Sequence, residues 1–137
     1  MEFLNKKFFV LGLGITGIAS CNKLIDLGAQ VFCFDENKDN TEIEAAKFVH
    51  YNKVNWSEID YLLLSPGIAL KYPKPHPIIE FVRNTKCKII GDIDIFKNII
   101  HEKSEIIAVT GTNGKSTTAS LIYHMLKHKC DSLILLI

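Results

Sequence analysis

Residues 8–17 read FFVLGLGITG, an apolar run that breaks into a glycine-rich turn at Gly12–Gly17. The run predicts a short buried strand, and the apolar spacing of residues 18–27 predicts a helix directly after the turn. Gly28 stands where a glycine C-cap is expected, and residues 31–34 predict a second strand that ends in Asp35. This stretch is therefore a predicted strand–helix–strand unit with a G-x-G-x-x-G turn and a following acidic residue.

A glycine-rich turn between a strand and a helix is typical of a phosphate site. Its glycines let backbone N–H groups approach an anion, and the positive end of the helix dipole attracts one. Asp35 is expected where it can reach a ribose or a base. The motif leaves the ligand open, because NAD, FAD and nucleotide sugars all carry a pyrophosphate. A merely tight turn that binds no ligand is the alternative.

A second turn of this kind lies nearer the other end of the chain, where residues 106–118 read IIAVTGTNGKSTT. The pattern predicts a strand at 106–109, a phosphate-binding loop at Gly111–Thr117 and a helix that carries Leu121. Lys115 adds a positive charge for terminal phosphates, and Ser116 offers a hydroxyl to Mg²⁺. The loop is shorter than the usual G-x-x-x-x-G-K-[ST], and the alternative is a plain turn with a chance lysine.

Further elements are predicted outside these two loops. We expect a short helix at 41–48, a buried strand at 61–64, a helix from Pro77, a strand at 87–90, a helix with Asp92 as N-cap, and a buried strand at 133–137. The strand at 61–64 runs into Ser65-Pro66-Gly67, at the carboxyl end where open α/β sheets bind ligands.

The order of these elements predicts an α/β protein. Residues 1–93 are interpreted as a Rossmann-like domain with a parallel sheet, and residues 94–137 as the start of a truncated P-loop ATPase-type central domain. We expect the second domain to be unstable by itself. Its apolar C-terminal tail is a predicted site of association.

The composition excludes several classes of function. The chain has 137 residues, 47% hydrophobic and 23% charged, with a net charge of +1, so it offers no basic surface for nucleic acid. No run reaches the ~20 apolar residues of a membrane span. Glycines interrupt the N-terminal apolar stretch that could be read as a secretory signal. The four cysteines form no C-x-x-C pair and the five histidines are scattered, so we expect a cytoplasmic protein without a metal cluster.

Four motifs occur together in a characteristic order. They are the turn at 12–17, Ser65-Pro66-Gly67-Ile68-Ala69, Gly91-Asp92-Ile93-Asp94-Ile95-Phe96 and the loop at 110–117. On these motifs the chain resembles the N-terminal part of the Mur ligase family, and within it the ligases that add D-glutamate. The alanine-adding Mur ligases typically have His in place of Asn113. Folylpolyglutamate synthases have a similar phosphate loop but lack the Rossmann-like unit.

The resemblance implies an ATP-dependent amide ligase of peptidoglycan synthesis. In that family the carboxylate of UDP-N-acetylmuramoyl-L-alanine takes the γ-phosphoryl group of ATP, and the amine of D-glutamate then attacks the acyl phosphate. ATP and Mg²⁺ are implied, with no nucleic-acid or membrane partner. Carried over, Lys115 is the catalytic residue and Ser116 the Mg²⁺ ligand. The UDP substrate is expected at Gly14, Ile15, Thr16, Asp35, Ser65 and Gly67, and ATP at Gly111, Thr112, Asn113, Gly114, Lys115, Ser116 and Thr117.

The sequence departs from the family in two respects. Glu36 and Asn37 stand where relatives often carry a Thr-Arg pair. The family's second Mg²⁺ ligand, its carbamylated lysine and its D-glutamate-binding domain would lie beyond residue 137, so we expect no turnover by these residues alone. The first alternative function is a non-catalytic nucleotide- or UDP-sugar-binding remnant. A Rossmann dehydrogenase domain is the second, and it leaves the loop at 111–117 unexplained.

Overall fold

The computed structural model describes residues 2–40, 42–71, 74–100 and 105–129. The chain divides into two compact units, Met1–Ile100 and His101–Ile137. Helix α3 (Asp92–Ile99) belongs to the first of these units, because it contacts helix α1 (Ile15–Asp26) and buries Ile95 there. The predicted domain boundary at residue 93 stays a prediction. No helix within the described ranges is long and apolar enough to cross a membrane.

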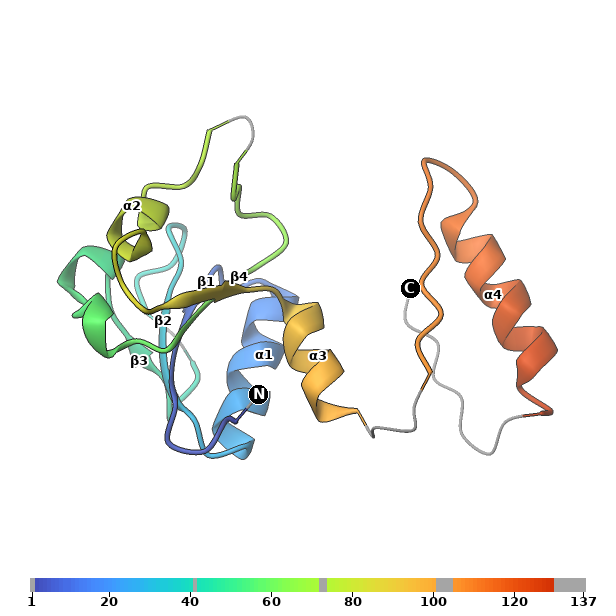
Figure 1. Cartoon of the computed structure of the whole chain (residues 1–137), viewed down its shortest axis with the longest axis horizontal. Helices are drawn as coiled ribbons and strands as arrows, with labels where there is room; N and C mark the ends of the chain where they lie inside the picture. Colours follow the sequence, from blue (N-terminus) through green and yellow to red (C-terminus); the bar gives the residue numbers. More distant parts are fainter. Residues whose placement is uncertain (1, 41, 72–73, 101–104, 130–137) are drawn as a thin grey trace. The chain divides into compact units, whose positions relative to one another are not determined.

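The first unit contains a parallel sheet of five strands in the order β3-β2-β1-β4-β5 (Figure 1). Its strands are β1 (Lys7–Leu11), β2 (Gln30–Phe34), β3 (Lys47–Phe48), β4 (Tyr61–Leu64) and β5 (Lys88–Ile90). The predicted α/β fold with a Rossmann-like parallel sheet is therefore confirmed. The chain adds β2 and β3 on one side of β1 and then returns to place β4 on the other. The boundary between β1 and β4 is thus the topological switch point, where such sheets bind ligands at their carboxyl ends.

Both faces of the sheet are covered, which explains why β1 is an unbroken apolar run. Phe8 and Val10 pack on one face with side chains of α1 and α3. Phe9 and Leu11 pack on the other face, under the short helices η1 (Tyr51–Lys53), η2 (Trp56–Glu58) and α2 (Ile78–Val82). The ring of Trp56 lies 5.0 Å from that of Phe9 between centroids, so this tryptophan reports on the packed state of the unit.

Two predicted details of the first unit are wrong. The predicted helix at 41–48 is replaced by a turn and by β3, which pairs with β2 through Phe32 and Cys33. Pairing at the sheet edge and burial of Ala46 override the local helix propensity; residue 41 itself lies outside the described ranges. Gly91, not Asp92, is the N-cap of α3, and the Asp94 carboxylate accepts the Gly91 N–H at 2.9 Å.

The second unit is described by residues 105–114, which form no helix or strand, and by helix α4 (Lys115–Leu126). The predicted strand at 106–109 does not form, and Ile106 and Ile107 are 49% and 59% exposed. A strand requires a ladder partner, and none of the described residues of this unit supplies one. The predicted strand at 133–137 and association through it concern residues outside the described ranges.

Candidate functional site

The first glycine-rich turn is fixed by close contact between β1 and α1. Gly12 has φ +89°, which favours glycine, and its N–H donates to the Phe34 carbonyl at 2.9 Å. A Cβ atom at Gly17 would lie 1.9 Å from the Gly12 carbonyl oxygen, so the helix approaches the turn too closely for any side chain at position 17. The first and third glycines of the motif are therefore required by the fold itself.

The middle glycine has a different environment. Gly14 is the N-cap of α1 with ordinary extended φ of −71°, and a Cβ built there would meet nothing within 4 Å. Ile15 is 93% exposed, and Thr16 is exposed beside it. The N-terminus of α1 has no side-chain cap and no acidic residue in its first turn. Its backbone N–H groups and dipole therefore face open space, as an anion site requires.

Asp35 connects β2 to this turn. Its carboxylate accepts the Leu13 N–H at 2.6 Å and the Asn37 N–H at 2.8 Å. These bonds, that of Leu13 above all, lower the pKa of Asp35, with the Lys38 charge adding to the effect. Asp35 thus holds the turn as a charged group, a structural role that the motif did not indicate.

Ser65 joins the same turn from β4, across the switch point. Its hydroxyl donates to the Gly12 carbonyl at 2.7 Å, and its N–H donates to the Leu11 carbonyl at 3.0 Å. Gly67 is exposed two residues further on, with no atom within 4 Å of a Cβ built there. The structure therefore brings Ser65 together with the Gly12–Gly17 turn, as the position of both at carboxyl strand ends predicts.

Two further polar contacts at this edge were missed by sequence reasoning. The Lys38 ammonium donates to the Leu13 carbonyl at 2.7 Å. The sequence signal that could have indicated this contact is a basic residue shortly after Asp35, the acid at the end of the strand. His76 Nε2 lies 2.9 Å from the Glu36 carboxylate, 40 residues away in the chain, and no sequence pattern indicates that pair. Because His76 Nδ1 accepts the Ile78 N–H, the proton of the neutral ring lies on Nε2 and is donated to Glu36.

The second glycine-rich loop is held by contacts within its own residues. Gly114 is the left-handed N-cap of α4 with φ +75°, and Gly111 has φ +152°. Lys115 curls back, so that its ammonium donates to the carbonyls of Gly111 at 2.7 Å and Thr112 at 3.2 Å. Thr112, Asn113, Ser116 and Thr117 are exposed around this turn.

The loop offers little to a metal ion apart from one hydroxyl. Ser116 lies in the first turn of α4, which contains no acidic residue. No group of three His, Cys, Asp or Glu side chains within the described ranges could hold a metal. This donor set fits Mg²⁺ bound mainly by phosphate oxygens and water, with one protein oxygen from Ser116.

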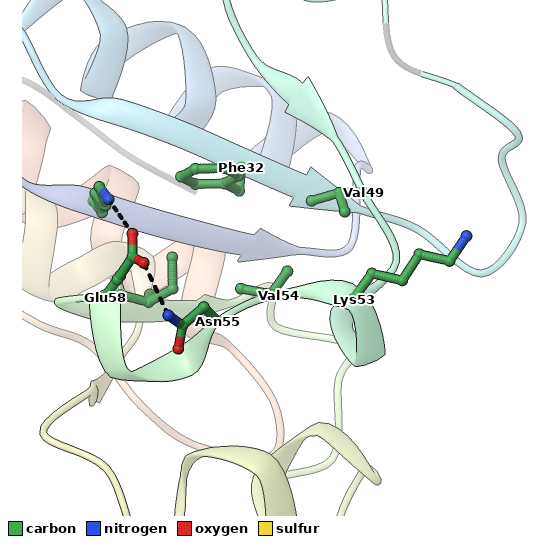
Figure 2. A pocket seen from close by; sticks show the side chains of 8 residues that line it. Phe32, Val49, Lys53, Val54, Asn55 and Glu58 are labelled. Atoms are coloured by element: carbon green, nitrogen blue, oxygen red, sulfur yellow. Dashed lines mark hydrogen bonds and ion pairs between the residues drawn. The ribbon is translucent and has the colours of Figure 1, made fainter.

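A cavity of about 140 Å³ lies elsewhere in the first unit, on the face of the sheet that η1 and η2 cover (Figure 2). Phe32, Val49 and Val54 surround it, and the Glu58 carboxylate at its edge is bound by Asn55 at 2.8 Å and by Lys7 at 2.6 Å. The polar groups of Lys7, Asn55 and Glu58 therefore satisfy one another. None of the sequence-predicted site residues lines it.

Comparison with known families matches both units. Residues 6–91 match the family described as "Mur ligase MurD-like, N-terminal domain", and residues 109–137 match "Mur ligase middle domain". Among solved structures, shikimate dehydrogenase from Aquifex aeolicus aligns over 77% of this chain and 52% of its own, with a TM-score of 0.52 and 16% identity. That similarity extends to the fold alone.

The chain is also similar to curated proteins that share one name. The UDP-N-acetylmuramoylalanine–D-glutamate ligase of Wolbachia sp. subsp. Brugia malayi is 43% identical over 131 residues, which span 92% of this chain and 26% of the relative. The ligase of that name from Caulobacter vibrioides is 40% identical, over 90% of this chain and 28% of its own length. The chain thus spans about a quarter of these relatives. The match to the N-terminal domain over residues 6–91 shows that the chain belongs to the Mur ligase family.

Proposed function

We propose that this chain supplies the UDP-substrate site and the ATP loop of a ligase that joins D-glutamate to UDP-N-acetylmuramoyl-L-alanine in peptidoglycan synthesis. The main support for the proposal is the hydrogen bond from Ser65 to the Gly12–Gly17 turn at the topological switch point. A second phosphate-type loop in the same chain and relatives named for this reaction support it.

In the proposed first site, the N–H groups of Ile15 and Thr16 receive the diphosphate of the UDP substrate. Gly14 leaves the space for it, since a Cβ there would point into an unfilled volume. Ser65 fixes the turn from the β4 side, and Gly67 leaves the neighbouring backbone accessible. Asp35 keeps the turn in shape through Leu13 and lies at the strand end where the nucleoside portion would extend.

In the proposed second site, Gly111–Thr117 receives ATP. Lys115 turns from the loop carbonyls to the terminal phosphates, where its charge stabilises the transferred group. Ser116 would hold Mg²⁺, which supplies additional neutralisation of phosphate charge when bound. The substrate carboxylate attacks the γ-phosphorus, giving an acyl phosphate and ADP, and the D-glutamate amine then displaces phosphate to form the amide. We assign this region substrate and ATP binding, and the complete reaction to the full-length enzyme.

Thermal unfolding followed through Trp56 tests the first site. UDP-N-acetylmuramoyl-L-alanine at 100 times its Kd should stabilise the first unit by about 2.7 kcal/mol, whereas NADH should not. Thr16→Arg should remove the shift, because position 16 is exposed and a long side chain there fills the proposed diphosphate space. Asn22→Arg, at another exposed position of α1, is the matched control and should keep it. A shift with NADH and none with the UDP substrate would refute the proposal.

Hydrogen exchange of the 111–118 amides tests the second site. Mg-ATP should slow their exchange in the wild-type chain and not in Lys115→Met, which loses the charge together with the bonds to the Gly111 and Thr112 carbonyls. Phosphate release by the 137-residue chain that depends on ATP, UDP-N-acetylmuramoyl-L-alanine and D-glutamate together would contradict the assignment of turnover to the full-length enzyme.

A further inference from the structure

The proposed diphosphate site has no cation within its own turn. Residues 12–17 contain no lysine or arginine, whereas the second loop contains Lys115. The Lys38 ammonium lies at the turn instead, 2.7 Å from the Leu13 carbonyl oxygen. It reaches the turn from the segment after β2, and its residue is exposed. A flexible, exposed ammonium on a backbone carbonyl can exchange that partner for a phosphate oxygen at small cost.

Two carboxylates near this turn, those of Asp35 and Glu36, are already engaged by other groups. Asp35 accepts the N–H groups of Leu13 and Asn37. Glu36 is held by His76 Nε2 at 2.9 Å, and Asp39 is exposed one residue beyond Lys38. A diphosphate brought to the N-terminus of α1 would add at least two negative charges beside these carboxylates. Backbone dipoles offset part of that repulsion, and a nearby cation such as Lys38 would offset more of it.

The second loop shows the same arrangement with its own lysine. Lys115 donates to the Gly111 carbonyl at 2.7 Å, the same distance as from Lys38 to the Leu13 carbonyl. In each case a lysine ammonium rests on a carbonyl of a glycine-rich loop just ahead of a helix. One lysine is part of its loop, and the other is supplied by a segment 25 residues away in the sequence.

We propose that Lys38 is a phosphate-binding residue of the first site, which turns from the Leu13 carbonyl to the diphosphate of the bound nucleotide. The proposal rests on the proposed function and adds a cationic ligand to it. It also accounts for specificity: the site takes a ligand with a diphosphate at the α1 N-terminus and discriminates against an uncharged nucleoside.

Titration calorimetry on the full 137-residue chain tests this, with UDP and UDP-N-acetylmuramoyl-L-alanine as probes. Lys38→Met should weaken both by roughly ten-fold, the value of one charge-assisted hydrogen bond. Lys38→Arg should restore most of the affinity. Lys23→Met, which removes an exposed lysine from the last turn of α1, is the control and should bind as the wild type does. Added NaCl should weaken the wild type more steeply than Lys38→Met.

The test separates a ligand role from a structural one. If Lys38 only braces the turn, Lys38→Met lowers the urea midpoint of the unliganded chain and its affinity in parallel, and the salt dependence stays that of the wild type. That result, or Lys38→Met binding UDP as tightly as Lys23→Met, would overturn the Lys38 proposal and leave the proposed function intact. Wild-type chain that binds neither probe would overturn both.

Discussion

Alanine substitutions at Gly17 and Gly14 should have opposite consequences, although both residues belong to one motif. The Cβ that Gly17→Ala introduces would start 1.9 Å from the Gly12 carbonyl oxygen and 3.0 Å from the Gly12 carbonyl carbon, so backbone must move. Overpacking of this kind costs about 1–3 kcal/mol, and a clash with backbone belongs at the upper end. Without the clash, Gly17→Ala inside α1 would stabilise the helix by up to ~1 kcal/mol. The sign of the change therefore tests the contact.

Gly14→Ala places its methyl group in open space with φ −71°, an ordinary value for alanine, so its effect on stability should stay below about 1 kcal/mol. It should instead weaken binding of the UDP substrate, because the methyl group enters the proposed diphosphate space.

Urea unfolding followed through the buried Trp56 measures both variants. For a unit of this size an m-value of about 1.5 kcal/mol/M is expected, so a loss of about 3 kcal/mol lowers the midpoint by about 2 M for Gly17→Ala. Gly14→Ala should shift it by less than about 0.7 M. If Gly17→Ala unfolds at or above the wild-type midpoint, α1 does not approach the Gly12 carbonyl as closely as the structure shows.

Three other perturbations test neighbouring parts of the structure. The pKa of Asp35 is lowered in the folded chain, so its contribution to stability is present above about pH 4, the pKa in the unfolded chain, and is lost as pH falls through the pKa in the folded chain. Asp35→Asn should therefore flatten the dependence of Tm on pH below pH 4. A dependence parallel to that of the wild type would contradict this. Ser65→Ala removes the hydroxyl bond to Gly12 and should cost about 1 kcal/mol, a fall in Tm of roughly 4–8 °C by calorimetry; an unchanged Tm would exclude this bond as a brace. Gly114→Ala forces a side chain into φ +75° and should cost about 1–2 kcal/mol at the start of α4, seen as faster amide exchange there with Trp56 fluorescence unchanged; unaltered exchange would argue against the left-handed N-cap.

Local patterns could predict the parts of the fold in which apolar residues are strongly periodic and glycines mark the ends of helices and strands. The apolar run 8–11, the turn at Gly12–Gly17 and Gly28 predicted β1, α1 and its end, and the structure has them there. Helix α1 ends at Asp26 with Leu27 as its C-cap, and Gly28 follows at φ +79°, the conformation that its sequence position indicated. Parallel order followed from alternation of strands and helices.

The parts that failed depend on partners distant in sequence. Residues 42–48 have good helix formers, but pairing with β2 and burial of Ala46 determine their structure. Ile106 and Ile107 have the composition of a strand, but no described residue of their unit pairs with them. At the site, the Glu36–His76 contact joins residues 40 positions apart, which no local pattern encodes.

The two loops also differ in what keeps them in shape, and this difference has a functional consequence. The first requires Asp35, 22 residues from Leu13, and Ser65, 53 residues from Gly12, so it exists only when the sheet is assembled. The second is held by Gly114, by Lys115 on carbonyls three and four residues back, and by the Thr118 N–H on the Gly114 carbonyl at 2.9 Å, all local contacts. None of the described residues of the second unit is buried. Partial unfolding of the first unit should therefore abolish its proposed anion site, whereas the second loop can form through local contacts and would gain rigidity from bound phosphate or further packing.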